Sequence, residues 1–170
     1  MTDAVEVQPW GPEDRALLAT LNSDPAQMEH VGGPESAAKI AERQERYERD
    51  PNQLVIVADG ARAGWVGFWE REWSDEQGRD ELVYEIGWSL LPAFQGRGIA
   101  TRATVLAVQR ARETGPPRPR SLHAFPGVDN PASNAVCRRV GFTLADADRA
   151  ITFDFPPGST MVCNDWRMTL

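Results

Sequence analysis

The sequence predicts a single domain of mixed α/β class. Its 170 residues are 41% hydrophobic, 8% aromatic and 25% charged, an ordinary globular composition. Segments with helical spacing of apolar residues follow one another along the chain with short β-rich runs between glycine and proline breaks. A chain of about 150 residues buries about two thirds of its unfolded surface, so no cross-link is needed to close the core. We therefore expect one domain over residues 1–170.

The first third of the chain predicts two helices joined by a loop. Residues 11–21 and 35–49 have apolar residues along one side, and Pro34 stands at the start of the second helix. The segment between them, residues 22–34, is predicted to be a loop or broken turn.

Three β-rich runs follow, at residues 54–58, 63–72 and 82–91. The pair Asp59-Gly60 between the first two is a hairpin signal. Pro92 ends the third run. Residues 97–112 then show helical spacing, and residues 121–125 form a short strand.

The next predicted helix has the clearest boundaries. Asn130 suits the N-cap, Pro131 the first helical position and Gly141 the C-terminal cap. Residues 150–155 and 161–169 are predicted to close the chain as two strands. The expected order is two helices, three strands, helix, strand, helix and two strands.

Charge is unevenly distributed. The net charge of −7 and the pI of about 4.9 argue against a general nucleic-acid binder. Residues 96–140 nevertheless hold eight arginines against Glu113 and Asp129, a balance of +6, which leaves −13 for the rest. The basic segment suggests one local anionic ligand, and the alternative is a solvated helix face with an Arg/Pro-rich loop.

The two cysteines, Cys137 and Cys163, form no CxxC pair and have no companion histidine cluster. Neither a disulfide framework nor a metal site is predicted, and a reducing, cytoplasmic setting is expected. The acidic start of the chain excludes a secretory signal there, and no segment is long and apolar enough to span a membrane.

The segment Gln95-Gly96-Arg97-Gly98-Ile99-Ala100 lies between a predicted strand and a predicted helix. Such a junction directs backbone N–H groups and a helix N-terminus at one point, where phosphate binds well. A P-loop would need a Gly-Lys pair, but the only lysine is Lys39. A dinucleotide-binding loop would need a third glycine where Thr101 stands and an acidic residue where Arg118 to Arg120 stand.

The same segment, read as Gln-x-x-Gly-x-Ala, resembles the pyrophosphate loop of the GNAT superfamily of N-acetyltransferases. The preceding residues 84–92 resemble the central strand of that family, and residues 130–142 resemble its later helix, which ends in Gly-Phe. The resemblance covers essentially the whole chain and is nearest to the branch of ribosomal-protein N-terminal acetyltransferases. It implies the GNAT fold, a mostly antiparallel twisted sheet flanked by helices.

The resemblance also implies a site for acetyl-CoA as co-substrate, without a metal. The backbone from Gly96 to Thr101 would bind the pyrophosphate, and Arg97 and Arg102 would add charge. Main-chain groups of the central strand and two residues of the later helix would lie along the pantetheine arm. The residues implied in cofactor binding are Ser89, Leu90, Leu91, Gln95, Gly96, Arg97, Gly98, Ile99, Ala100, Thr101, Arg102, Asn130 and Ser133.

Direct attack of an amine on the thioester needs a base, an oxyanion donor and an acid. Glu85 is the candidate base, since alternation places it on one strand face with Gly87 and Ser89. It could instead be a solvated residue or an arginine partner. A main-chain N–H at Leu90 or Leu91 is the candidate oxyanion donor. The acid is left open between Ser133, Cys137 and water.

The loop between the first two helices is the expected wall of the acceptor site, because it often has this place in the family. Asp24, Glu29 and His30 in it are candidate contacts for a cationic amine, with Trp10 nearby. The negative charge outside residues 96–140 favours polyamine-like, aminoglycoside-like or basic-peptide acceptors. His123 is expected to be a half-buried structural residue. Sheet packing is the expected role of three tryptophans on alternate positions of one strand, Trp65, Trp69 and Trp73.

The predicted function is therefore acetyl-CoA-dependent acetylation of a primary amine on a small molecule or a protein N-terminus. An acyl-CoA-binding or sensing module with little catalysis is the alternative, since Cys137 stands where many relatives carry a tyrosine. A purely structural interaction domain would leave the glycine loop unexplained. We expect a monomer or homodimer, with Trp166 and the closing strand at a sheet edge, and no nucleic-acid or membrane partner.

Overall fold

The fold is built on one seven-stranded sheet. The computed structural model describes residues 4–74, 77–114, 119–145, 151–154 and 160–170. The strand order is β1-β2-β3-β4-β5-β9-β6, and every neighbouring pair is antiparallel except β4 with β5. The strands are β1 (Val5–Pro9), β2 (Gln53–Ala58), β3 (Ala61–Ser74), β4 (Asp80–Leu90), β5 (Ser121–Ala124), β6 (Thr143–Leu144) and β9 (Trp166–Thr169). A separate two-stranded sheet pairs β7 (Ile151–Asp154) with β8 (Thr160–Cys163).

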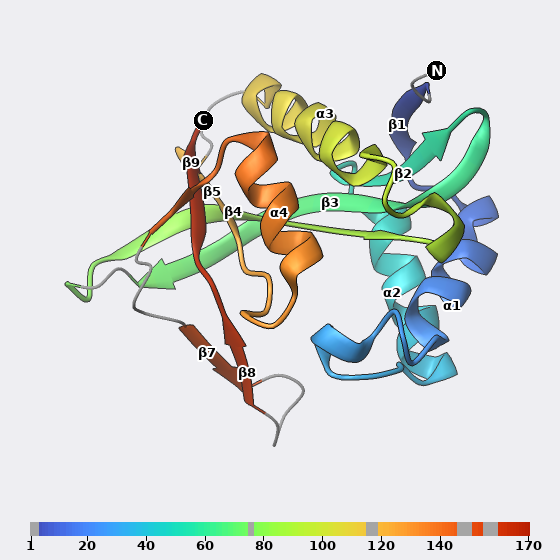
Figure 1. Cartoon of the computed structure of the whole chain (residues 1–170), viewed down its shortest axis with the longest axis horizontal. Coiled ribbons are helices and arrows are strands. Elements are labelled where there is room, and N and C mark those ends of the chain that lie inside the picture. Colours follow the sequence, from blue (N-terminus) through green and yellow to red (C-terminus); the bar gives the residue numbers. More distant parts are fainter. Residues whose placement is uncertain (1–3, 75–76, 115–118, 146–150, 155–159) are drawn as a thin grey trace.

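Helices cover both faces of the large sheet (Figure 1). On one face lie α3 (Ile99–Glu113) and α4 (Pro131–Val140), and on the other lie α1 (Arg15–Ser23) and α2 (Ala37–Arg49). Three short 3-10 turns complete the elements: η1 (Pro12–Asp14), η2 (Glu29–Val31) and η3 (Pro92–Phe94). The architecture confirms the predicted mixed class with a mostly antiparallel, helix-flanked sheet.

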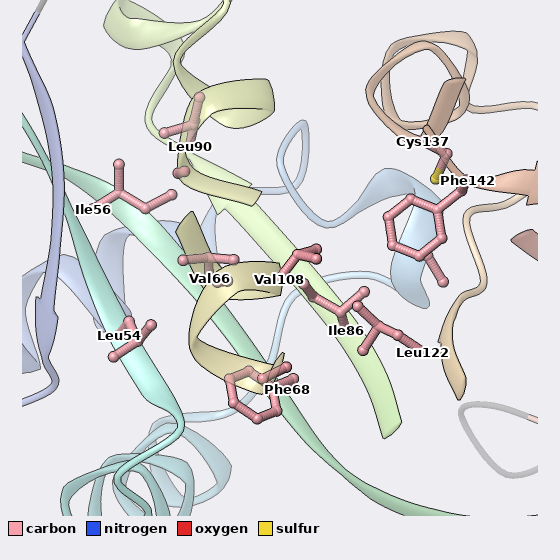
Figure 2. Close-up of a cluster of buried hydrophobic side chains, with 14 of the residues drawn as sticks. Leu54, Ile56, Val66, Phe68, Ile86, Leu90, Val108, Leu122, Cys137 and Phe142 are labelled. Atoms are coloured by element: carbon pink, nitrogen blue, oxygen red, sulfur yellow. The ribbon is translucent and has the colours of Figure 1, made fainter. Parts of the chain in front are cut away.

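Two buried clusters hold the layers together. The larger lies under α3 and α4 and contains Phe68, Ile86 and Leu122 from three strands of the sheet (Figure 2). The smaller lies under α1 and α2 and centres on Leu18, Tyr47 and other side chains that meet β2. Because both faces of β2 are buried, that strand has no alternating burial pattern and reads as one continuous apolar run.

The predicted interior elements are confirmed with shifts of a few residues at their ends. The hairpin turn follows its signal: Asp59 and Gly60 have φ of 51° and 79°, the left-handed pair that a two-residue turn needs. The helix after Asn130 has the predicted caps, since the Asn130 side chain accepts from Ser133 N–H at 3.0 Å and Gly141 has φ of 100°. The second helix begins two residues later than predicted, because Ser36 provides its N-cap.

The predicted order of elements is wrong at both ends. It omits β1, a short strand whose ladder is with the distant β2, from Val5↔Ala58 to Pro9↔Leu54. It also omits β6 and merges β8 and β9 into one strand. The chain bends between these two strands, where Asn164 N–H donates to Pro126 O at 3.0 Å, and each half joins a different sheet.

The expected edge position of Trp166 is also wrong. Its strand β9 lies between β5 and β6, and its side chain is only 6% exposed. Within the described ranges, no helix combines the length and apolar character required to cross a membrane.

A polar network anchors α4 to the end of the sheet. Asn134, on the buried side of α4, accepts hydrogen bonds from Trp166 Nε1 and Asn164 Nδ2, both at 2.8 Å. Its own Nδ2 donates to Gly127 O at 2.9 Å and to Asn130 O at 2.7 Å. These contacts join α4 to its own N-cap, to the loop before it and to residues 164 and 166, so Asn134 fixes where the helix begins.

Replacing Asn134 by alanine is expected to lower the free energy of unfolding by about 1–3 kcal/mol, because buried hydrogen-bonding groups lose their partner. Chemical denaturation would measure it. Arg139→Ala, at an exposed position on the same helix, should change it by less than about 0.5 kcal/mol. Equal effects of the two substitutions would contradict a stabilising role for the network.

Candidate active site

The site is organised by an open edge of β4. This strand pairs with β3 along its whole length, from Ser74↔Asp80 to Gly64↔Leu90. Its pairing with β5 is restricted to Tyr84↔Leu122 and Glu85↔His123. Beyond Glu85 the two strands separate, and the last part of β4 has no strand partner on that side.

The alternation of the ladder directs the polar groups of Leu90 toward the open edge. Leu91 N–H donates to Ala63 O at 2.9 Å, so the main-chain groups of the next residue back point away from β3. Leu90 O accepts instead from two side chains, Gln27 Nε2 at 2.9 Å and Gln95 Nε2 at 3.0 Å. The main-chain groups of Leu90 therefore face the gap between β4 and β5. Leu91 N–H is instead hydrogen-bonded to β3, so it is not available as an oxyanion donor.

The glycine loop follows directly and turns into α3. Gly96 and Gly98 have φ of 72° and 73°, which L side chains rarely adopt, and a Cβ at either would stand in open space. Gly98 is the N-cap of α3, and no side chain caps the helix or places an acidic group in its first turn. The first N–H groups of α3 are therefore left to an external acceptor, which makes this helix end a suitable site for a phosphate.

Two arginines lie at this helix end. Arg97 Nη2 is 3.4 Å from Asp59 Oδ2, and Arg102 Nη2 donates to Arg97 O at 3.3 Å. The rest of the basic segment is dispersed: Arg110 and Arg112 are at the far end of α3, on Pro51 O and Met168 Sδ. Arg118 lies outside the described residues. Arg97 and Arg102 are thus the two arginines of the basic segment that the described contacts place at the start of α3.

Glu85 lies beside the open edge, on the sheet face that α1 and α2 partly cover. Its carboxylate forms an ion pair with Arg71 Nη1 from β3, and its side chain is 16% exposed. An arginine partner was the predicted alternative to a catalytic role for Glu85, and Arg71 is that partner. Arg71 itself was missed, because its place on the same face two residues beyond Trp69, the register partner of Glu85, follows from strand register, which no local pattern shows.

His123, the register partner of Glu85, is more deeply buried than predicted. It is 1% exposed, and its Nδ1 lies 3.0 Å from Asp165 Oδ1. Asp165 also accepts from Arg167 Nε at 2.7 Å. The pair links β5 to the bend before β9, in agreement with a structural histidine.

Cys137 belongs to the core rather than to the open edge. It is fully buried beside Phe142 in the cluster drawn in Figure 2. Burial raises the pKa of its thiol to about 12. A thiol in this state keeps its proton near neutral pH and has no access to solvent, so it is removed from the candidate acids, and Ser133 and water remain.

The loop between α1 and α2 lies across the open edge. Gln27, which the sequence reading missed, joins this loop to Leu90 O and to Gln95, with Gln95 Nε2 3.2 Å from Gln27 Oε1. His30 Nδ1 lies 3.4 Å from Asp129 Oδ1, in the loop before α4. Of the other candidates, Asp24 accepts from Ala26 N–H in its own turn and Glu29 is exposed. No sequence spacing marks Gln27, since its partner is 63 residues away.

The described part of the chain holds no group of three or more His, Cys, Asp or Glu side chains that could bind a metal ion. The open edge, the uncapped helix and the half-buried carboxylate are the features available for chemistry.

A family model for the acetyltransferase (GNAT) domain matches residues 5–143. The chain belongs to this family. Membership confirms the resemblance seen in the motifs. As a GNAT domain, it carries the open β4 edge and the glycine loop within the matched residues.

Individual relatives agree with this GNAT assignment. Mycothiol acetyltransferase of Mycolicibacterium gilvum (strain PYR-GCK) is 30% identical over 143 residues, which cover 82% of this chain and 46% of that protein. The chain spans about half the length of the curated relatives it matches.

Solved structures share the GNAT fold over nearly the whole chain. The yncA protein of Salmonella typhimurium, solved with acetyl-CoA, superposes with a TM-score of 0.73 at 19% identity, covering 98% of this chain and 94% of that one. A Salmonella typhimurium enzyme that modifies the N-terminal serine of ribosomal protein L7/L12 gives 0.69 at 20%, covering 98% and 95%. The second is of the ribosomal-protein type that the motifs resemble.

Burial predicts that both cysteines of this GNAT domain are unreactive while it is folded. Cys137 and Cys163 are 0% exposed, and burial is the main cause that raises their thiol pKa values, to about 12 and about 11. Iodoacetamide near neutral pH should modify neither residue in the folded protein and both after denaturation, as read by mass spectrometry. Labelling of Cys137 in the folded state would return it to the candidate acids.

Proposed function

We propose that this chain is an acetyl-CoA-dependent N-acetyltransferase that transfers an acetyl group to a primary amine. The observation that carries the proposal is the open edge of β4, which presents Leu90 main-chain groups next to the uncapped N-terminus of α3. An extended chain ending in a pyrophosphate fits these two features together. The acceptor is a small molecule or a protein N-terminus.

The proposed acetyl-CoA site extends from the glycine loop along the open edge of β4 to the start of α4. Backbone N–H groups from Gly96 to Thr101 bind the pyrophosphate, helped by the helix dipole. Arg97 and Arg102 add positive charge beside it. The pantetheine arm lies along the open edge at Leu90, where it competes with Gln27 and Gln95 for the carbonyl oxygen. Asn130 and Ser133, at the start of α4, lie along the same arm.

The reaction is a direct displacement. The ammonium of the acceptor gives a proton to Glu85, and the amine nitrogen then attacks the thioester carbonyl carbon. The negative charge that develops on the carbonyl oxygen is stabilised by Leu90 N–H. Collapse of the intermediate breaks the carbon–sulfur bond and gives the amide, while the coenzyme A sulfur receives a proton from water or Ser133.

The acceptor approaches from the side of the α1–α2 loop. Asp24, Glu29 and His30 remain the proposed contacts there, and the His30–Asp129 contact at 3.4 Å brings two of the walls together. The cytoplasmic location and the monomeric or homodimeric state remain predictions.

Filling the glycine loop should abolish binding of the donor. In calorimetric titrations the unsubstituted chain should bind acetyl-CoA with a Kd of about 1–100 μM, within the usual range for enzyme substrates. Gly98→Trp should lose this binding, because the indole occupies the phosphate space. The matched control is Gly78→Trp: Gly78 has the same φ of 73° and the same open surroundings in another turn. Loss of binding in both variants would mean that backbone strain, not the loop, is responsible.

Removing the proposed base should affect turnover rather than donor affinity. Glu85→Gln should lower kcat by at least about a hundredfold, the usual contribution of a general base. The Kd for acetyl-CoA should stay within about twofold. Glu81→Gln, at an exposed position of the same strand, is the control and should change neither. Equal losses in kcat and affinity, or no loss, would remove Glu85 from this role.

A binding or sensing module is the alternative reading of the same donor site. It predicts acetyl-CoA binding that Gly98→Trp abolishes, together with no release of coenzyme A across a broad set of amines. Release of coenzyme A with any amine decides for the enzyme.

A further inference from the structure

Three tryptophans of β3 lie on the sheet face that carries Glu85. Trp69 stands directly opposite Glu85 in the antiparallel register, and Trp65 and Trp73 are four residues away on either side. Residues on alternate positions share a face, so all three side chains project to the side of the candidate acceptor site. All three are half-buried rather than buried. Their predicted role is sheet packing, yet none of the three residues is fully buried.

The rings form an ordered row that ends at the candidate base. Tyr47 of α2 stacks on Trp65 with a centroid distance of 5.3 Å, and Trp65 stacks on Trp69 at 6.3 Å. Gly87, two residues from Glu85, lies beneath both indoles: a Cβ there would be 3.1 Å from one ring and 3.4 Å from the other. The row is therefore seated on the backbone of β4 and held by α2, so Trp69 is a rigid apolar platform next to Glu85.

Two carboxylates near this platform, those of Glu85 and Asp165, already have arginine partners. Arg71 pairs with Glu85. The buried Asp165 contacts His123 at 3.0 Å and Arg167 at 2.7 Å. Attraction of a polycation requires several unpaired carboxylates close to its binding site. Negative charge elsewhere on the chain contributes little there, because salt screens charges that lie more than about 10 Å apart. The local charge thus favours an acceptor with a single positive charge.

Three exposed valines come together near the same place. Val31, Val128 and Val162 are 41%, 48% and 40% exposed. Val128 N–H donates to Val162 O at 3.0 Å, and the neighbours of Val31 and Val128 in sequence form the His30–Asp129 contact. We call these three residues the valine rim.

The valine rim and Glu85 belong to one region. Cys163, the residue after Val162, forms an isolated β-bridge with Gly127. Two residues before Gly127, the ring of Phe125 lies 5.4 Å from the guanidinium carbon of Arg71, the ion-pair partner of Glu85. These contacts bring β8 close to the candidate base. The acceptor side therefore combines an aromatic floor, an apolar rim and one carboxylate that is paired with arginine.

We propose that the acceptor is a monoamine whose amino group is carried on an aromatic or bulky apolar body, which lies on Trp69 and against the valine rim with the nitrogen at Glu85. This inference rests on the proposed function and names the substrate class of the same site. The chemistry is shared by an arylalkylamine and by a peptide with a large apolar N-terminal residue, and the two sources are separate arms of the test.

The test measures release of coenzyme A from acetyl-CoA with matched amines. Phenethylamine and tryptamine represent small acceptors, a tripeptide with N-terminal phenylalanine represents peptides, propylamine lacks the body, and spermidine carries extra charge. The kcat/KM for the better aromatic arm should exceed that for propylamine and spermidine by at least about tenfold, the discrimination expected from filling an apolar pocket. A higher value for the tripeptide than for the small amines would identify the peptide source, and the reverse the small-molecule source.

Variants then place the preference on named residues. Trp69→Ala should raise KM for the aromatic acceptor by at least about tenfold, and Trp69→Phe should restore most of the loss. Val128→Asp should raise the same KM, whereas Val105→Asp, at a 38% exposed position of α3, should have no effect. The Kd for acetyl-CoA should stay within about twofold in all four variants, which reports that each remains folded.

Three results would overturn the inference: a preference for spermidine, acetyl-CoA binding without turnover of any aromatic amine, or aromatic turnover that Trp69→Ala and Val128→Asp leave unchanged. Absence of acetyl-CoA binding to the folded, unsubstituted chain is a different outcome, because it refutes the proposed function itself. The donor titration therefore separates the two failures.

Discussion

The parallel pairing of β4 with β5 ends after Glu85 and His123, and the candidate site exists because it ends there. On the β3 side the ladder continues to Leu90, so the end of β4 is held rigidly by one neighbour while its other edge stays open. Main-chain groups at an open edge need partners, because an unpaired buried peptide group is costly. Here the side chains of Gln27 and Gln95 donate hydrogen bonds to Leu90 O. A ligand can replace these two hydrogen bonds without breaking any pairing of the sheet.

The same gap joins the donor and acceptor sides of the molecule. Gln27 belongs to the α1–α2 loop, yet it contacts both Leu90 O and the Gln95 side chain at the start of the glycine loop. A ligand that displaces these contacts at the β4 edge also changes how the loop is held. The His30–Asp129 contact connects this loop to the segment before α4, so segments distant in sequence meet around one opening.

Electrostatics act locally in this protein. The charge imbalance in the sequence, basic over residues 96–140 and acidic elsewhere, suggests a broad attraction for an anion on one part and a cation on another. In the structure Arg110 and Arg112 of α3 contact separate partners, and Glu85 forms an ion pair with Arg71. Arg97 and Arg102 lie at the glycine loop. The positive charge of the basic segment is therefore divided among separate contacts, and part of it acts at the start of α3.

The sequence by itself determined what depends on neighbours along the chain. The caps of α4, the Asp59-Gly60 turn and the two left-handed glycines before α3 follow from side-chain and backbone preferences within a few residues, and the family motifs rest on these same segments. Only the tertiary structure decided the Arg71–Glu85 pair, the burial of Cys137, the interior place of β9 and the contact of Gln27 with Leu90. Each of these depends on strand register or on which face packs inward. Register is set by long-range pairing, and one sequence pattern is compatible with several pairings until the whole sheet is assembled.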